Sequence, residues 1–138
     1  MTSRRTSVTC PGATPVNITL WIIAGILAAV FLLAGAVKVT QPREKLAEQM
    51  GWVTDSSDGF VKFVGAVEVL GAVGLVLPAA TGIAVWLTPL AAAGLALTMV
   101  GAVVVHLRRG ETAGAVQSLV VGVLAAFVAV MRFGPHAF

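Results

Sequence analysis

Four long apolar blocks constrain this chain more than any other feature of its sequence. They cover about residues 18–39, 60–77, 83–107 and 113–131, and few charged residues interrupt them. Each block is close to the ~20 residues that an α-helix needs to cross a hydrocarbon layer. We therefore expect an all-α fold, an antiparallel bundle of four transmembrane helices.

The composition of the 138-residue chain agrees with a membrane location. Charged residues make up only 11% and hydrophobic residues 58%, whereas soluble domains carry about 25% charged residues. The net charge of +3 comes from Lys and Arg residues that cluster near the ends of the blocks, where they anchor helices at the membrane edge. We expect a multi-pass protein of the plasma (inner) membrane, with lipid and no nucleic acid as its partner.

Outside the blocks, the sequence divides into a polar leader, two charged turns and a tail. Residues 1–17 form the leader and residues 133–138 the tail. Within the larger turn, a short surface helix is expected from Pro42 to Met50. The second block is expected to end at Pro78, because proline removes a helical hydrogen bond.

Positive charge is concentrated in the turns at residues 40–59 and 108–112 and in the adjoining helix ends. The positive-inside rule then places these two turns in the cytoplasm and both termini on the other side. The basic residues on the side of the turns are Lys38, Arg43, Lys45, Lys62, Arg108 and Arg109, against Arg4, Arg5 and Arg132 on the side of the termini.

Small residues predict where the helices meet. In lipid there is little hydrophobic force between helices, so close backbone approach at Gly, Ala and Ser supplies the van der Waals contact. The expected contact points are Gly71, Gly74, Ala91 to Gly94, Gly101, Ala102, Gly122, Ala125 and Ala126.

Four polar side chains within the predicted spans are the candidate site residues: Lys38, Glu68, His106 and Gln117. Because successive spans run in opposite directions, all four fall in the same half of the bilayer. Glu68 is the deepest, roughly 12 Å below the start of its span at 1.5 Å per residue. An ionisable group at this depth is costly unless it is paired or neutralised, so each is a candidate for function.

Two interpretations of these residues remain open. In the functional one, Glu68 is paired with Lys38 or His106 at the centre of a polar pocket for a head group, a quinone-like molecule or a proton. In the structural one, Lys38 and His106 extend to the membrane surface, Gln117 hydrogen-bonds within the bundle, and Glu68 joins helices.

Motifs for catalysis or metal binding are missing from the sequence. The single cysteine, Cys10, excludes an intramolecular disulfide and a C-x-x-C pair. No nucleophile–base pair, phosphate-binding Gly loop or H-E-x-x-H spacing is present. We expect no catalytic residue, no metal and no resident cofactor, with a quinone left open as a ligand, and the balance is against an enzyme.

Several short motifs resemble the DoxX-like family of four-span membrane proteins. They are Phe31 to Lys38 (F-L-L-A-G-A-V-K), Pro42, Gly65 to Leu75 (G-A-V-E-V-L-G-A-V-G-L), Pro78, Pro89 to Ala92, Met99, Ala102 and His106 to Arg109. The resemblance covers Leu20 to about Arg132 and implies a four-helix membrane fold. Its polar motif falls on Lys38, Glu68 and His106. The family takes its name from a subunit associated with thiosulfate:quinone oxidoreductase, and some relatives look like membrane partners of redox-stress proteins.

Three functions follow as hypotheses. The first is a non-catalytic membrane subunit or scaffold, which docks a protein partner or a second copy through residues 40–59 or a lipid-facing helix. The second is a binding or transport site for a quinone, lipid or solute, centred on Glu68. The third, a membrane subunit of a thiosulfate/quinone oxidoreductase, rests on the family resemblance alone.

Overall fold

The computed structural model describes residues 15–136, and within them the chain is helical. The helices are α1 (Pro15–Thr40), α2 (Arg43–Gln49), α3 (Asp58–Thr81), α4 (Leu87–Arg108) and α5 (Thr112–Phe133), with a 3-10 helix, η2 (Gly51–Asp55), after α2. Most of the expected leader, including Cys10, lies outside the described residues, and so do the last two residues of the expected tail.

The four long helices, α1, α3, α4 and α5, are each long and apolar enough to cross a membrane. The predicted all-α bundle of four transmembrane helices is therefore confirmed. Their outer surfaces carry many exposed large apolar side chains, as on Ile22, Leu70, Leu97 and Val130. Such surfaces are expected to face the hydrocarbon of a bilayer, because in water they would promote aggregation.

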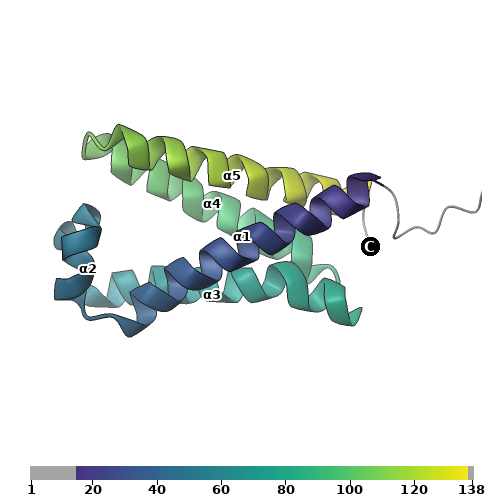
Figure 1. Ribbon diagram of the computed structural model, residues 1–138, viewed down its shortest axis with the longest axis horizontal. Helices are drawn as coiled ribbons and strands as arrows, with labels where there is room; N and C mark the ends of the chain where they lie inside the picture. Colours follow the sequence, from purple (N-terminus) through teal and green to yellow (C-terminus); the bar gives the residue numbers. More distant parts are fainter. Residues whose placement is uncertain (1–14, 137–138) are drawn as a thin grey trace, which may run out of the picture.

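The long helices are arranged as two pairs (Figure 1). Contacts are most extensive within the α1–α3 pair and within the α4–α5 pair, whereas those between α1 and α5 are sparse. The start of α1 and the end of α5 lie together at one end of the bundle, which we call the terminal end. At the other end, the turn end, α2 lies between the two pairs.

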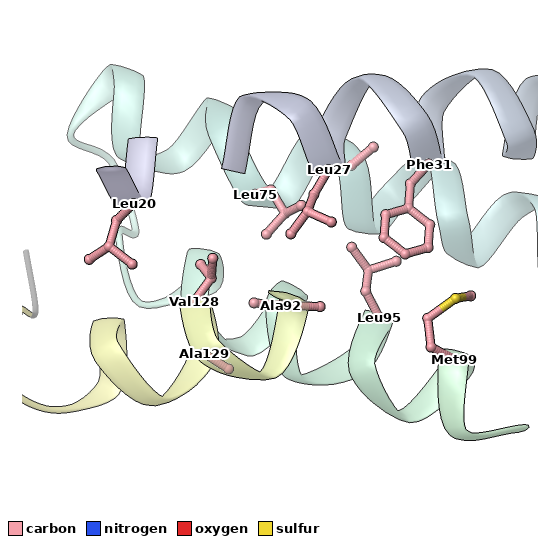
Figure 2. Packing of buried hydrophobic residues seen from close by; sticks show 11 residues of the cluster. Leu20, Leu27, Phe31, Leu75, Ala92, Leu95, Met99, Val128 and Ala129 are labelled. Carbon is pink, nitrogen blue, oxygen red and sulfur yellow. The ribbon is translucent and has the colours of Figure 1, made fainter. Parts of the chain in front are cut away.

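The main core fills the bundle toward the terminal end and its middle. Leu27 and Phe31 of α1 point toward Leu95 of α4, and Leu20 lies near Val128 of α5 (Figure 2). All five side chains are at most 2% exposed. Both helix pairs thus share one core, whose contacts fix their relative position.

A second, smaller core holds the segment after α1 against the bundle. Leu46 of α2, Val53 of η2 and Val61 of α3 are all at most 2% exposed and pack together. The short helix expected from Pro42 to Met50 is present as α2, with Pro42 directly before its first residue. Its buried leucine folds this segment back over the turn end.

The second span does not end where the sequence suggested. Helix α3 continues through Pro78 to Thr81 and ends at Gly82, whose φ of 71° is the left-handed conformation that glycine adopts readily. Proline removes only one helical hydrogen bond, and the buried Pro78 ring packs inside the bundle. The next span begins at Leu87 rather than at residue 83, so Pro89 lies in its first turn, where the missing N–H costs little.

Some of the expected small-residue contacts are present. A Cβ on Gly71 would meet Leu95, one on Gly74 would meet Ala91, and one on Gly122 would meet Met99, each closer than 3.0 Å. The expectation is wrong for Gly94 and Gly101, because a Cβ on either would have no neighbour within 4 Å. These two glycines lie on an outer surface of α4.

Candidate functional site

The candidate site begins where α1 crosses α3. A Cβ on Gly35 would stand 2.6 Å from the carbonyl oxygen of Gly65, and one on Gly65 would stand 2.7 Å from the Cβ of Lys38. Backbones can come this close only when neither residue has a side chain. Sequence reasoning missed both glycines as packing residues, although each lies three residues before a charged residue of its own helix.

Those two charged residues form a buried ion pair. Nζ of Lys38 donates to Oε2 of Glu68 at 2.9 Å, and the two side chains are 9% and 5% exposed. Residues three apart lie on the same face of a helix, so the glycine crossing brings both side chains to one point between α1 and α3. Of the two partners that the sequence left open for Glu68, the structure selects Lys38.

The ion pair lies beside two cavities rather than in packed protein. A cavity of about 470 Å³ opens between α1 and α5, and one of about 380 Å³ opens between α3 and α4. We call them the α1–α5 cavity and the α3–α4 cavity. Both are lined by Lys38, Trp52, Glu68, Met99, His106 and Ser118. The Lys38–Glu68 pair therefore forms part of the wall that the two cavities share.

His106 is oriented by a carboxylate in the α4–α5 turn. Its Nδ1 lies 2.7 Å from Oε2 of Glu111, whose Oε1 accepts from Nε of Arg109 at 3.0 Å. A Cβ on Gly114 would stand 2.6 Å from the same Nδ1, so the glycine leaves room for the ring. A Cβ on Gly51 would meet Arg109 and Glu111 within about 3 Å, which shows how closely η2 lies against this turn.

The charge state of Glu111 fixes the role of the His106 ring nitrogens. The hydrogen bonds from Arg109 and then His106 hold the pKa of the Glu111 carboxyl below its usual range. An ionised carboxylate only accepts hydrogen bonds, so Nδ1 of His106 carries a proton. In a neutral ring, Nε2 is then left as an acceptor.

The remaining candidate, Gln117, lies at the rim. It is exposed and lines the α1–α5 cavity, and no hydrogen bond of its side chain is found within residues 15–136. The next residue, Ser118, is only 9% exposed and lines both cavities. Sequence reasoning missed Ser118 and Trp52 as cavity residues, because neither is ionisable.

Across the part of the chain that is described, no group of three or more His, Cys, Asp or Glu residues could hold a metal ion. The polar groups that line both cavities are instead one ammonium, one carboxylate, one imidazole, one hydroxyl and the indole N–H of Trp52. Such a set can hydrogen-bond a small polar group.

A second buried charge lies at the terminal end, away from the cavities. Arg132 is 5% exposed, and its Nη1 donates to Oδ1 of Asn17 at 2.6 Å and to the carbonyl oxygen of His136 at 3.0 Å. Its guanidinium also lies 6.0 Å from the ring centroid of Trp21. The sequence suggested an exposed membrane anchor, but this side chain joins α5 to α1.

Comparison with known proteins agrees with this architecture. The model of the DoxX-like family matches residues 22–128, which include all of α3 and α4, most of α1 and α5, and Lys38, Glu68 and His106. Searches of curated proteins and of solved structures found no match. On the extent of the family match, the chain belongs to the DoxX-like family of integral membrane proteins.

Proposed function

We propose that this DoxX-like protein binds a small amphipathic molecule of the membrane at the Lys38–Glu68 ion pair. The observation that carries the proposal is that two cavities converge on one buried ion pair and share it. An ion pair that served only to join helices would be expected in close-packed surroundings. Here it is accessible to a ligand on two sides.

The hydrogen bonds of the pair support this function. Among the described residues, the Glu68 carboxylate accepts one bond, from Lys38, and its Oε1 has no donor. A lysine ammonium has three N–H groups, and Lys38 donates one. Polar groups away from water are costly when their hydrogen bonds are unmade, so a bound polar group would be stabilised here.

Purification in a mild detergent tests the proposal. Small molecules extracted from the purified parent protein are quantified per chain and compared with those from a variant that carries both Lys38→Met and Glu68→Leu. The proposal expects about one molecule per chain in the parent and a loss of at least about tenfold in the variant, as for removal of a buried polar anchor worth about 1.4 kcal/mol or more. Equal retention by both proteins would contradict it.

The same preparation examines the other hypotheses. A non-catalytic subunit or scaffold would bring down a protein partner in fixed stoichiometry, and that role stays a prediction. Its expected docking segment, residues 40–59, already uses Leu46 and Val53 in the protein's own core, which leaves only its outer side for a partner. Participation in a thiosulfate/quinone oxidoreductase stays a prediction that rests on the family resemblance.

For orientation, we propose that the turn end faces the cytoplasm. The support is the excess of Lys and Arg near the turns at residues 40–59 and 108–112. Lys38 is best left out of that count, because it is buried in the ion pair. The exposed residues Lys45, Arg108 and Arg109 carry the argument instead.

A further inference from the structure

The two cavities differ in the character of their mouths. The α1–α5 cavity reaches polar groups of the turn end, including Glu111 and Gln117. The α3–α4 cavity is bordered by Phe60, Phe63 and Val105, whose side chains are 51%, 64% and 37% exposed on the outer surface of spanning helices. One mouth therefore faces polar surroundings and the other faces the hydrocarbon of the bilayer.

The two mouths meet at polar atoms that include both hydrogen-bond donors and acceptors, among them the Lys38 ammonium and the Glu68 carboxylate. Oε1 of Glu68 has no donor within residues 15–136. With Nδ1 of His106 held by Glu111, Nε2 is the ring nitrogen left to face a ligand. A hydroxyl, which both donates and accepts, can donate to Glu68 and accept a further N–H of Lys38 without separating the two side chains.

Charge restricts the head group further. The ammonium of Lys38 already neutralises Glu68, and Arg109 is bonded to Glu111. An ammonium head group would bring a second positive charge next to Lys38, and a carboxylate would bring a second negative charge next to Glu68. A neutral hydroxyl avoids both repulsions and the cost of desolvating an ion.

We propose that the ligand is a neutral, single-chain amphiphile whose hydroxyl group binds at the Lys38–Glu68 pair, where it donates to Glu68, and whose hydrocarbon chain leaves between α3 and α4 past Phe63 and Gly101. This inference rests on the function proposed above and specifies the chemical class of the ligand and its path. The hydrocarbon chain of the ligand lies against exposed aromatic and aliphatic side chains. Its head group occupies the space next to the residues that line both cavities.

Trp52 provides a direct reporter, because it lines both cavities. The variant with Trp21→Phe and Trp86→Phe keeps Trp52 as its single tryptophan. The probe is a saturated fatty alcohol with bromine on the second carbon, adjacent to the carbon that carries the hydroxyl. Bromine quenches tryptophan fluorescence on contact. We expect the brominated alcohol to quench the fluorescence of Trp52 in a saturable way, and an unbrominated alcohol to reverse the quenching. The matching bromoalkane, bromo-amine and bromo-carboxylate should bind at least about tenfold more weakly, or about 1.4 kcal/mol.

Two glycines of α4 allow a matched test of the path. Gly101 lines the α3–α4 cavity, whereas Gly94 lies two turns away outside it, and a Cβ on either would have no neighbour within 4 Å. Both can therefore accept a Cβ without a clash. Gly101→Leu should weaken the alcohol at least about tenfold, or about 1.4 kcal/mol, by obstructing the gap, and Gly94→Leu should leave its affinity unchanged.

The outcomes separate this inference from the function on which it rests. Equal quenching by the alkane and the alcohol, tighter binding of the amine or the carboxylate, or equal effects of the two leucines would each overturn it. If a co-purified molecule depends on Lys38 and Glu68 while the alcohol does not quench Trp52, the binding function stands and this ligand class is wrong. If neither is observed, both fail.

Discussion

The backbones of Gly35 and Gly65 touch where α1 crosses α3, one helical turn before Lys38 and Glu68. A Cβ on Gly35 would stand 2.6 Å from the carbonyl oxygen of Gly65 and 2.8 Å from Cγ2 of Val69. Neither a backbone carbonyl nor the adjoining helix can move away independently. The geometry of the ion pair therefore depends on the absence of two side chains.

The substitution Gly35→Ala should separate α1 from α3 and lower the free energy of unfolding by about 1–3 kcal/mol, the usual cost of overpacking. Gly25→Ala on the same helix is the control, because its Cβ would have no neighbour within 4 Å. It should be neutral or stabilising by up to about 1 kcal/mol, since alanine favours a helix over glycine. Denaturation in detergent measures both, and equal effects would show that the crossing is not tightly packed.

Removing one member of the ion pair should cost more than removing both. Glu68→Ala or Lys38→Met leaves a buried charge without its partner, at a cost of about 3–5 kcal/mol. The combination of Lys38→Met with Glu68→Gln should recover part of that loss. Melting temperatures of the single and combined variants test this, with Lys62→Met as a control at the same end of the bundle. Strictly additive effects would mean that the two side chains do not interact.

Glu68→Gln separates the ion pair from the shape of the site. Glutamine keeps the volume and can accept from Lys38, but it carries no charge. If Glu68 only packs and hydrogen-bonds, this variant should retain near-parent stability and co-purified ligand. If its charge is needed, ligand retention should fall while the protein stays folded. Ligand content per chain and melting temperature, measured on the same sample, distinguish the two results.

Glu111 should make stability depend on pH in the acidic range. Its pKa is lowered in the folded protein by hydrogen bonds from Arg109 and His106. A carboxyl of this kind stabilises the fold fully above its unfolded pKa of about 4.3, and the contribution is lost as pH falls through the lower folded value. The difference in melting temperature between the parent and Glu111→Gln should be constant near neutral pH and shrink below about pH 4.

A matched carboxylate controls for general acid effects. Glu44 is exposed on α2, and Glu44→Gln removes a carboxylate at the same end of the bundle without touching Arg109 or His106. If Glu111→Gln and Glu44→Gln change the melting temperature equally at every pH, the contacts of Glu111 with Arg109 and His106 contribute nothing to folding.

Accessibility to labelling should reveal the orientation in the membrane. After Cys10 is replaced, Ser57→Cys at the turn end should not react with an impermeant thiol reagent added outside the cell. A reporter fused at Phe138 should lie in the opposite compartment from one inserted at residues 55–59. Ready labelling of Ser57→Cys would reverse the orientation, and two reporters in one compartment would contradict four spans.

Hydropathy was sufficient to predict the number and approximate bounds of the spans, because the length of an apolar block directly reports whether it can cross a bilayer. Alternating direction then placed Lys38, Glu68 and His106 in one half of the membrane. The end of α3 was mispredicted at Pro78, because proline in a membrane helix can be accommodated by neighbouring helices. Helix α3 ends instead at Gly82, whose backbone is in the left-handed conformation.

The rotation of each helix about its axis could not be predicted in the same way. These helices are apolar on all sides, so periodicity does not distinguish the face toward the bundle from the face toward lipid. For that reason Gly35, Gly65 and Gly114 were not recognised as contact residues, whereas Gly94 and Gly101 were wrongly expected to be. The burial of Arg132 and the contact between His106 and Glu111 depend on the same rotations.

The unequal contact of the two helix pairs has a mechanical consequence. At the terminal end, Leu20 packs near Val128 and Arg132 bonds to Asn17, so the pairs are joined there. Toward the turn end, α1 and α5 are separated by a cavity. A rigid rotation about the joined end would displace each residue in proportion to its distance from that end, so a small change in packing at Leu20 would be amplified at the cavity. We therefore expect the width of the α1–α5 cavity to depend partly on side chains at the opposite end of the bundle.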